Sequence, residues 1–77
     1  MVSKQDETFL AIAQAGSVSK AAQGLYLSQP AVSRSLKRLE EDLGAQLFDR
    51  EAVPLRLTQA GERYLRYVRE NQERERR

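Results

Sequence analysis

The 77-residue chain is long enough for one small domain, and it contains neither cysteine nor histidine. Disulfides, thiolate metal sites and the usual nucleophile–base pairs of enzymes are therefore excluded, and we expect no catalytic residue, metal or cofactor. Thirteen basic and eleven acidic residues give a net charge of +2, which favours a polyanionic partner only weakly. With no apolar run near the roughly 20 residues of a membrane span and no recognisable signal peptide, a cytoplasmic protein is expected.

The first predicted helix spans residues 4–15. Its apolar residues recur at helical spacing, namely Phe9, Ile12 and Ala13. Gly16 follows them and is suited to end the helix in the left-handed conformation.

A second, short helix is predicted over residues 18–25. Ser17 or Ser19 can cap its N-terminus, because a serine hydroxyl accepts a hydrogen bond from an orphan backbone N–H. Ala21 and Ala22 are small enough to let a neighbouring helix approach closely. Only a few residues separate this helix from the next, so the two must turn sharply against each other.

Ser28 is the expected N-cap of a third helix, which runs to about Leu43 and stops at Gly44. Pro30 falls in the first turn, where backbone N–H groups have no intrahelical partner in any case. At ~100° per residue, one narrow stripe is apolar and predicts the core face: Val32, Leu36, Leu39 and Leu43.

The opposite face of this helix is polar, then basic, then acidic. Gln29, Ser33, Arg34 and Lys37 come first, and Glu40, Glu41 and Asp42 follow. A helix in the DNA major groove presents its N-terminal residues to base edges, where Gln suits adenine and Arg suits guanine. Phosphates repel the acidic residues, so the helix should leave the duplex there. The plainer interpretation is a surface helix with solvated charges.

Two short alternating runs, residues 47–50 and 55–57, predict a small hairpin, with Pro54 in its turn or at an edge. Thr58 can cap a fourth helix that starts at Gln59, and beyond its last apolar residue the tail is polar. The order helix, helix, helix, hairpin, helix predicts a mainly α fold, a winged helix-turn-helix with a three-helix core, a two-stranded wing and a C-terminal linker or dimerisation helix. We divide it into residues 1–58, the winged helix-turn-helix, and residues 59–77, the linker.

Three blocks of sequence, in order and with intact spacing, resemble the N-terminal DNA-binding domain of LysR-type transcriptional regulators: FLAIAQAGSVSKAA, LYLSQPAVSRSLKRLEEDLGAQLFDR and LRLTQAGERYL. The resemblance covers residues 9–65. It implies sequence-specific binding to double-stranded DNA as a dimer on an inverted-repeat operator, in the bacterial cytoplasm and nucleoid. It also implies that an effector ligand would act only through a separate domain, which these 77 residues do not contain.

Carried over by position, the resemblance assigns base contacts to Gln29, Pro30, Ser33 and Arg34. It assigns phosphate contacts at helix starts to Ser17, Ser19 and Ser28, although a capping serine need never touch DNA. Lys37 joins the DNA-binding set because of its place on the helical wheel. Arg50 and Arg56 flank the wing and complete the set, but Arg50 is as well placed to pair with Asp49 or Glu51.

The resemblance also implies that the fourth helix pairs with its counterpart in a second subunit. The candidate seam residues are Ala60, Gly61, Tyr64 and Val68, whereas Leu65 is assigned to the core. Because the apolar residues stop at Val68, we expect only a weak dimer.

Two departures from the family pattern carry expectations of their own. The wing tip, residues 51–54, lacks the usual glycine and basic residue, so the wing should contribute little to DNA binding. Ser3 and Asp6 stand where leucines usually anchor the first helix, so its first turn is expected to fray. The alternative function is a winged helix that binds another protein. An enzyme would have only the acidic cluster of residues 40–42, which is better explained as a solvated face.

Overall fold

The structure, a computed structural model, describes residues 3–75, the last two by their backbone alone, so residues 76–77 of the predicted linker lie outside the described part. It confirms the winged helix-turn-helix. In chain order the elements are α1 (Lys4–Ala15), α2 (Val18–Leu25), α3 (Gln29–Leu43), β1 (Phe48–Asp49), β2 (Arg56–Leu57) and α4 (Gln59–Glu75).

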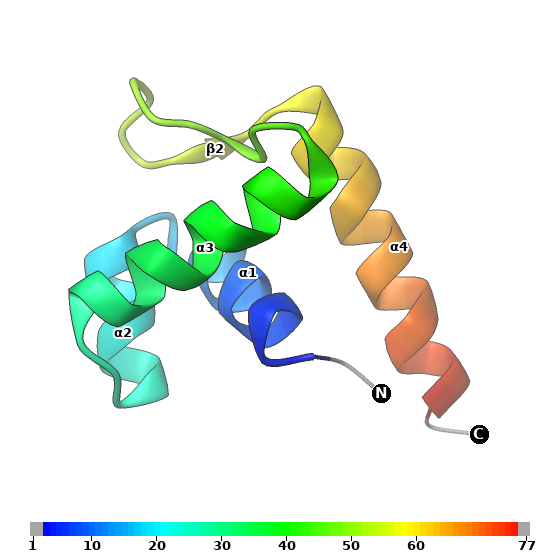
Figure 1. Ribbon diagram of the computed structural model, residues 1–77, viewed down its shortest axis with the longest axis horizontal. Coiled ribbons are helices and arrows are strands. Elements are labelled where there is room, and N and C mark those ends of the chain that lie inside the picture. The colour runs from blue at the N-terminus through cyan, green and yellow to red at the C-terminus, as the bar shows by residue number, and fades with distance from the viewer. Residues whose placement is uncertain (1–2, 76–77) are drawn as a thin grey trace.

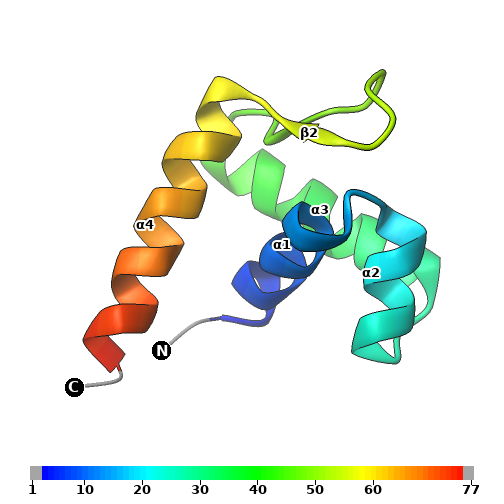
Figure 2. The ribbon, with the colours of Figure 1, turned by 180° about the vertical axis from the view of Figure 1, so that it is seen from behind.

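Helices α1, α2 and α3 pack together, with the wing above α3 and α4 slanting down the other side (Figure 1). The view from behind shows the wing and α4 meeting at the top of the molecule (Figure 2). The wing is a two-stranded antiparallel sheet in which Phe48 pairs with Leu57 and Asp49 pairs with Arg56. None of the helices within residues 3–75 is long and apolar enough to cross a membrane.

The helix boundaries follow from capping groups, as the sequence indicated. Ser17 and Ser28 accept hydrogen bonds from the backbone N–H groups of Lys20 and Ala31, at 3.2 Å each. Gly44 ends α3 with a φ of 68°, a conformation that costs glycine little. These local signals place the start and end of α3 without reference to the rest of the fold.

Phe9 lies at the centre of the core. Its ring is 5.5 Å from the Phe48 ring, measured between centroids, and 5.2 Å from the Tyr64 ring. The core therefore joins α1, the wing and α4. The fully or nearly fully buried apolar side chains are Phe9, Ile12, Ala21, Ala22, Val32, Leu36, Leu39, Leu47, Phe48 and Val68.

The start of α4 is fixed against the segment that leads into β1. The Thr58 hydroxyl donates to the Gln46 carbonyl at 2.6 Å and accepts from the Gly61 backbone N–H at 3.0 Å. A Cβ added at Gly61 would lie 2.1 Å from the Leu47 carbonyl oxygen, so only glycine fits there. The first half of α4 is thereby part of the folded unit.

Two expectations are corrected by this packing. Leu43, assigned to the core, is about half exposed, because it is the last residue of α3 and the chain turns away at Gly44. The first turn of α1 does not depend on leucines. Ser3 caps the helix through the Asp6 N–H, and Asp6 accepts a hydrogen bond from the Tyr64 hydroxyl. These polar contacts hold the turn that was expected to fray.

Candidate nucleic-acid interface

The N-terminal half of α3 presents a polar surface to solvent. Its outward side chains are all exposed, and they are Gln29, Pro30, Ser33, Arg34 and Lys37. On the opposite side of the helix, Val32, Leu36 and Leu39 are buried against the core. The helical-wheel assignment of these two faces is therefore confirmed.

The side chains of Gln29, Ser33, Arg34 and Lys37 share a second property. Within residues 3–73, whose side chains the structure describes, none of them has a hydrogen-bond or ion-pair partner. Their donors and acceptors are thus available to a partner molecule. The fold does not require these residue types at these positions.

The serines assigned to phosphate contacts fall into two classes. Ser17 and Ser28 are N-caps, and each hydroxyl oxygen is occupied by a backbone N–H. Since a hydroxyl that accepts one hydrogen bond can still donate its proton, capping leaves one donor at each helix start. Ser19 lies in the first turn of α2, is exposed, and is not the cap.

Glu40 is the clearest departure from the sequence interpretation. We expected it in a solvated acidic group, but it is 8% exposed. Its Oε2 accepts the Leu47 backbone N–H at 2.7 Å, and its Oε1 accepts Arg50 Nη2 at 2.5 Å. Its helical position supplied a signal, because it stands four residues after Leu36 and therefore beside the core stripe.

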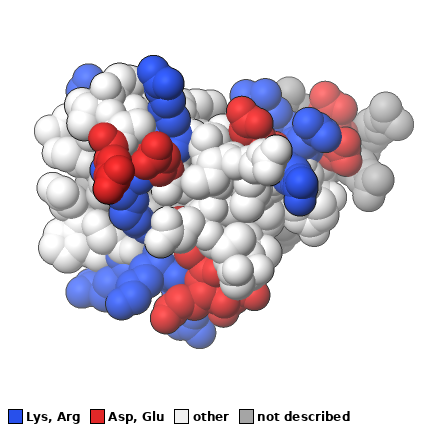
Figure 3. Space-filling model, turned by 90° about the horizontal axis from the view of Figure 1, so that it is seen from above, with Lys and Arg blue, Asp and Glu red and all other residues white. Residues whose placement is uncertain are grey.

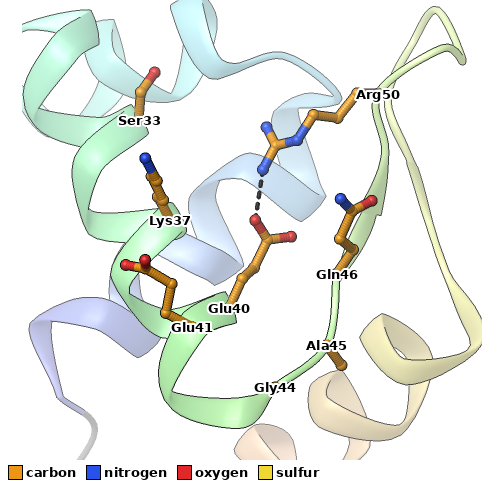
Figure 4. A pocket seen from close by; sticks show the side chains of 8 residues that line it. All are labelled: Ser33, Lys37, Glu40, Glu41, Gly44, Ala45, Gln46 and Arg50. Atoms are coloured by element: carbon orange, nitrogen blue, oxygen red, sulfur yellow. Dashed lines mark hydrogen bonds and ion pairs between the residues drawn. The ribbon is translucent and has the colours of Figure 1, made fainter.

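Arg50 is consequently an ion-pair residue, but neither predicted partner is the right one. It pairs with Glu40, while the Asp49 carboxylate accepts the Glu51 backbone N–H at 3.0 Å. The Arg50 side chain is still 50% exposed. It lies across a cleft from Ser33 and Lys37, so the fold brings three of the predicted DNA-binding residues to one place (Figure 4).

The wing carries Arg56 on β2 as an exposed side chain opposite Asp49. Its tip is anchored to the body of the protein. The Leu55 N–H donates to the Gly16 carbonyl at 2.9 Å, and Pro54 lies close to the Gly16 backbone. The fold therefore sets the position of the wing relative to the α1–α2 turn.

The residues predicted for the dimer seam are mostly occupied within one chain. Val68 is 1% exposed and belongs to the core, which contradicts its assignment to the interface. Gly61 is buried against Leu47, and Tyr64 packs on Phe9. Burial and the Asp6 hydrogen bond raise the pKa of the Tyr64 hydroxyl well above its usual value. Of these four residues, Ala60 lines an open surface and is neither buried nor packed on Phe9.

That open surface is an apolar groove of about 260 Å³ between the end of α3 and the first half of α4. Tyr67, which was not predicted, is 56% exposed there, and Leu43 stands opposite it. Tyr67 stands three residues after Tyr64 in α4, so helical spacing was the signal in the sequence that places both on neighbouring parts of one face.

Charge is not spread evenly over the molecule. The face seen from above carries separate groups of basic side chains with acidic side chains beside them, rather than one continuous basic surface (Figure 3). Among the side chains of residues 3–73, no group of acidic residues is arranged to hold a metal ion. Any attraction to a polyanion is therefore local and depends on which basic residues face it.

Comparison with known proteins places this geometry in a family. Residues 3–62 match the family model described as bacterial regulatory helix-turn-helix protein, lysR family. The HTH-type transcriptional regulator MetR of Haemophilus influenzae is 48% identical over 83% of this chain. TfdT of Cupriavidus pinatubonensis is 44% identical over 80% of it. The chain spans only 21% and 27% of the lengths of these two relatives.

Solved structures agree with the sequence comparison. The BenM_DBD/catB site 1 DNA complex superposes with a TM-score of 0.86 at 32% identity, covering 92% of this chain and 80% of that one. The CbnR_DBD-DNA complex gives 0.84 at 38% identity, with 91% and 80% covered. Both of those proteins are described as bound to DNA.

Proposed function

Because this chain belongs to the lysR family of bacterial regulatory helix-turn-helix proteins, we propose that it binds double-stranded DNA sequence-specifically, with α3 in the major groove. One observation carries the proposal. Gln29, Ser33 and Arg34 are exposed on one face of α3, and within the described residues their side chains have no partner. Helix-turn-helix proteins read base edges with the N-terminal part of such a helix.

The chemistry of that face fits base readout. The Gln29 amide has a donor and an acceptor for adenine, and Arg34 can make two parallel hydrogen bonds to guanine. Ser33 suits either base, and Pro30 offers an apolar edge. Ser17, Ser19 and Ser28 stand at helix starts, where backbone N–H groups and the helix dipole favour phosphate.

The wing has a smaller part in this proposal. Arg56 is its exposed cation, but the tip residues Glu51 and Val53 offer phosphate no positive charge. The number of phosphates contacted sets the steepness with which affinity falls with salt. We therefore expect this chain to show a shallower salt dependence than a relative with a basic wing tip.

We also propose that the chain binds an inverted repeat as a homodimer. The groove lined by Leu43, Ala60 and Tyr67 is the apolar surface that remains for a second copy, since Gly61 and Val68 are covered. On this view residues 1–58 form the DNA-binding unit, and residues 59–77 both complete its core and link it to a partner. The groove is small, so the dimer of this chain should be weak and should strengthen on a palindromic site.

In this role the protein is a bacterial transcriptional regulator rather than an enzyme, and it acts in the cytoplasm at the nucleoid. Its relatives are named as transcriptional regulators and are about four to five times longer than the aligned segment. An effector would therefore act through a separate domain. The groove between α3 and α4 is the surface that the linker, residues 59–77, itself lines.

The test is selection of duplexes from a random-sequence pool by the 77-residue chain. An enriched inverted repeat is expected, and Arg34→Ala should weaken binding to it by about 10- to 100-fold, the magnitude of one lost bidentate base contact. Arg66→Ala removes the same charge from α4 and is the matched control. If no sequence is enriched, or if both variants weaken binding equally, specific readout by α3 is wrong.

Sedimentation of the chain with and without the selected duplex tests the dimer. Monomer alone and two copies on the duplex are expected. Tyr67→Asp should reduce the affinity for the two-site duplex and leave binding to a single half-site unchanged. One copy on the two-site duplex would contradict the dimer and leave the DNA-binding proposal intact.

A further inference from the structure

A cleft of about 590 Å³ lies between the DNA-facing side of α3 and the segment that leads into and out of β1. Ser33, Lys37 and Glu41 line it from α3, and Arg50 lies across it at the end of the wing strand (Figure 4). Glu40 is at its base. This α3–β1 cleft is separate from the base-reading tip of α3 at Gln29.

The base of the cleft is rigid because both Glu40 oxygens are engaged. Oε2 holds the Leu47 backbone N–H at 2.7 Å, and Oε1 holds Arg50 Nη2 at 2.5 Å. The Glu40 side chain is also nearly buried, so little space surrounds the carboxylate. The Arg50 guanidinium is therefore fixed at one edge and directed over the cleft.

Arg50 keeps most of its hydrogen-bonding capacity. A guanidinium has five N–H donors, and one nitrogen of Arg50 is engaged by Glu40. Its side chain is half exposed, and Lys37 lines the same cleft from α3. Two cations thus face one space, and Glu41 at the outer rim is the acidic group that remains unpaired there.

The location of the cleft identifies the group that would enter it. With α3 in the major groove, a sugar–phosphate strand borders the helix on each side, and the wing lies beside α3 (Figure 1). The space between α3 and the wing therefore faces one of these strands, and its cations meet phosphate oxygens. The sequence argument ended DNA contact before Glu40 because of its charge. Pairing with Arg50 removes that objection for Glu40, whereas Glu41 at the outer rim keeps its charge.

The geometry points to the α3–β1 cleft as a site for one DNA backbone phosphate, held between Lys37 and Arg50, with Glu40 as the positioning residue for Arg50. This inference rests on the proposed DNA binding and extends the contact surface by one helical turn. Glu40 does not touch DNA. It fixes the guanidinium so that phosphate binding does not have to order a free arginine side chain.

Three variants separate these roles. Arg50→Gln and Lys37→Gln each remove one cation from the cleft. Glu40→Gln keeps an oxygen for the Leu47 N–H but loses the charge that holds Arg50. Lys4→Gln, at the distant start of α1, is the control with the same loss of charge as the cation variants. Circular dichroism checks that each variant is folded.

Affinity for the duplex selected by the wild-type chain is measured over a range of salt concentrations. Arg50→Gln should reduce the slope of log affinity against log salt by up to about 0.9 for each bound copy, the value for one phosphate contact, because Lys37 still meets the same phosphate. Glu40→Gln should weaken binding by about three- to tenfold with Arg50 present and should have no effect in the Arg50→Gln background. A purely structural role of Glu40 would weaken both backgrounds equally.

Duplexes with a single neutral methylphosphonate locate the phosphate. One position per half-site should weaken wild-type binding more than it weakens binding by Arg50→Gln, in which Lys37 alone still meets that phosphate. Tighter binding by Glu40→Gln would mean that Glu40 only neutralises Arg50 and would overturn the positioning role. If Arg34→Ala abolishes binding but Arg50→Gln and Glu40→Gln change nothing, the phosphate site is wrong and the proposed function stands. If the wild-type chain selects no duplex, both are wrong.

Discussion

The two halves of α3 use their polar side chains in different ways. In the first half, Gln29, Ser33 and Arg34 are exposed and have no partner within residues 3–73. In the second half, Glu40 holds both the Leu47 N–H and Arg50, and so ties the helix to the wing. A polar group that the fold does not use is available for binding, whereas a buried and bonded one stabilises the fold. Substitutions should divide along the same line.

The largest effect is expected where α4 crosses the segment that Glu40 holds. Gly61→Ala would place a methyl group 2.1 Å from the Leu47 carbonyl oxygen, which is backbone and cannot rotate aside. We expect the free energy of unfolding to fall by about 3 kcal/mol, measured by urea denaturation. Gly24→Ala is the control. Nothing lies within 4 Å of a Cβ added at Gly24, and because this position is helical the free energy of unfolding should rise by up to about 1 kcal/mol. Equal effects would mean that α4 is not fixed there.

Glu40→Ala tests the bonded half of α3 directly. It leaves the Leu47 N–H without its acceptor and Arg50 without its partner, so stability should fall by about 2 kcal/mol. Glu41→Ala, one residue further on and exposed, should change stability by less than about 0.5 kcal/mol. Similar losses in the two variants, measured by thermal unfolding, would refute the distinction between bonded and solvated acids.

The contact between α1 and α4 gives a pH-dependent prediction. The Tyr64 hydroxyl donates to Asp6, and its pKa is raised in the folded protein. As pH rises, the Tyr64 hydroxyl loses its proton at a lower pH in the unfolded chain than in the folded protein. The contribution of this hydroxyl to stability is therefore complete below about pH 10 and is lost as pH rises above it. Tyr64→Phe should reduce stability at neutral pH by on the order of 1 kcal/mol and flatten the alkaline part of the curve. Tyr26→Phe, at an exposed position, should leave that curve unchanged.

Tyr26 is an exposed residue whose substitution is expected to raise stability rather than lower it. It ends α2 with a φ of 57° and is 96% exposed, so the fold carries the strain of a left-handed tyrosine without burying its ring. Tyr26→Gly relieves that strain but makes the unfolded chain more flexible. The net expected gain in stability is about 0.5 to 1 kcal/mol. A loss of stability would show that the ring makes a contact that the fold needs.

The smallest effects are expected in the unbonded half of α3. Ser33→Ala and Arg34→Ala should each change the free energy of unfolding by less than about 0.5 kcal/mol, because neither side chain is bonded or buried. Chemical denaturation of the two variants beside Glu40→Ala gives the comparison in one experiment. A loss above 1 kcal/mol in either would mean that the first half of α3 also serves the fold.

The sequence by itself determined the helices, their ends and the outward face of α3. Ser17, Ser28 and Gly44 act on backbone groups a few residues away, so their effect can be read from neighbouring positions. The same holds for the apolar stripe of α3 and for the hairpin. The ordered motifs around Gln29 also led to the family that the comparisons support.

Only the tertiary structure decided which polar and apolar groups remain free. Glu40 meets Arg50 ten residues on, Tyr64 meets Asp6 fifty-eight residues back, and Val68 enters a core that begins in α1. Such pairs depend on how the helices cross. A helical wheel places Glu40 beside the core stripe, but it shows neither the bond from Arg50 to Glu40 nor the burial of Val68. The chain's own packing occupies both residues, which moves the expected dimer contact to the groove beside Tyr67 and makes the α3–β1 cleft a candidate phosphate site.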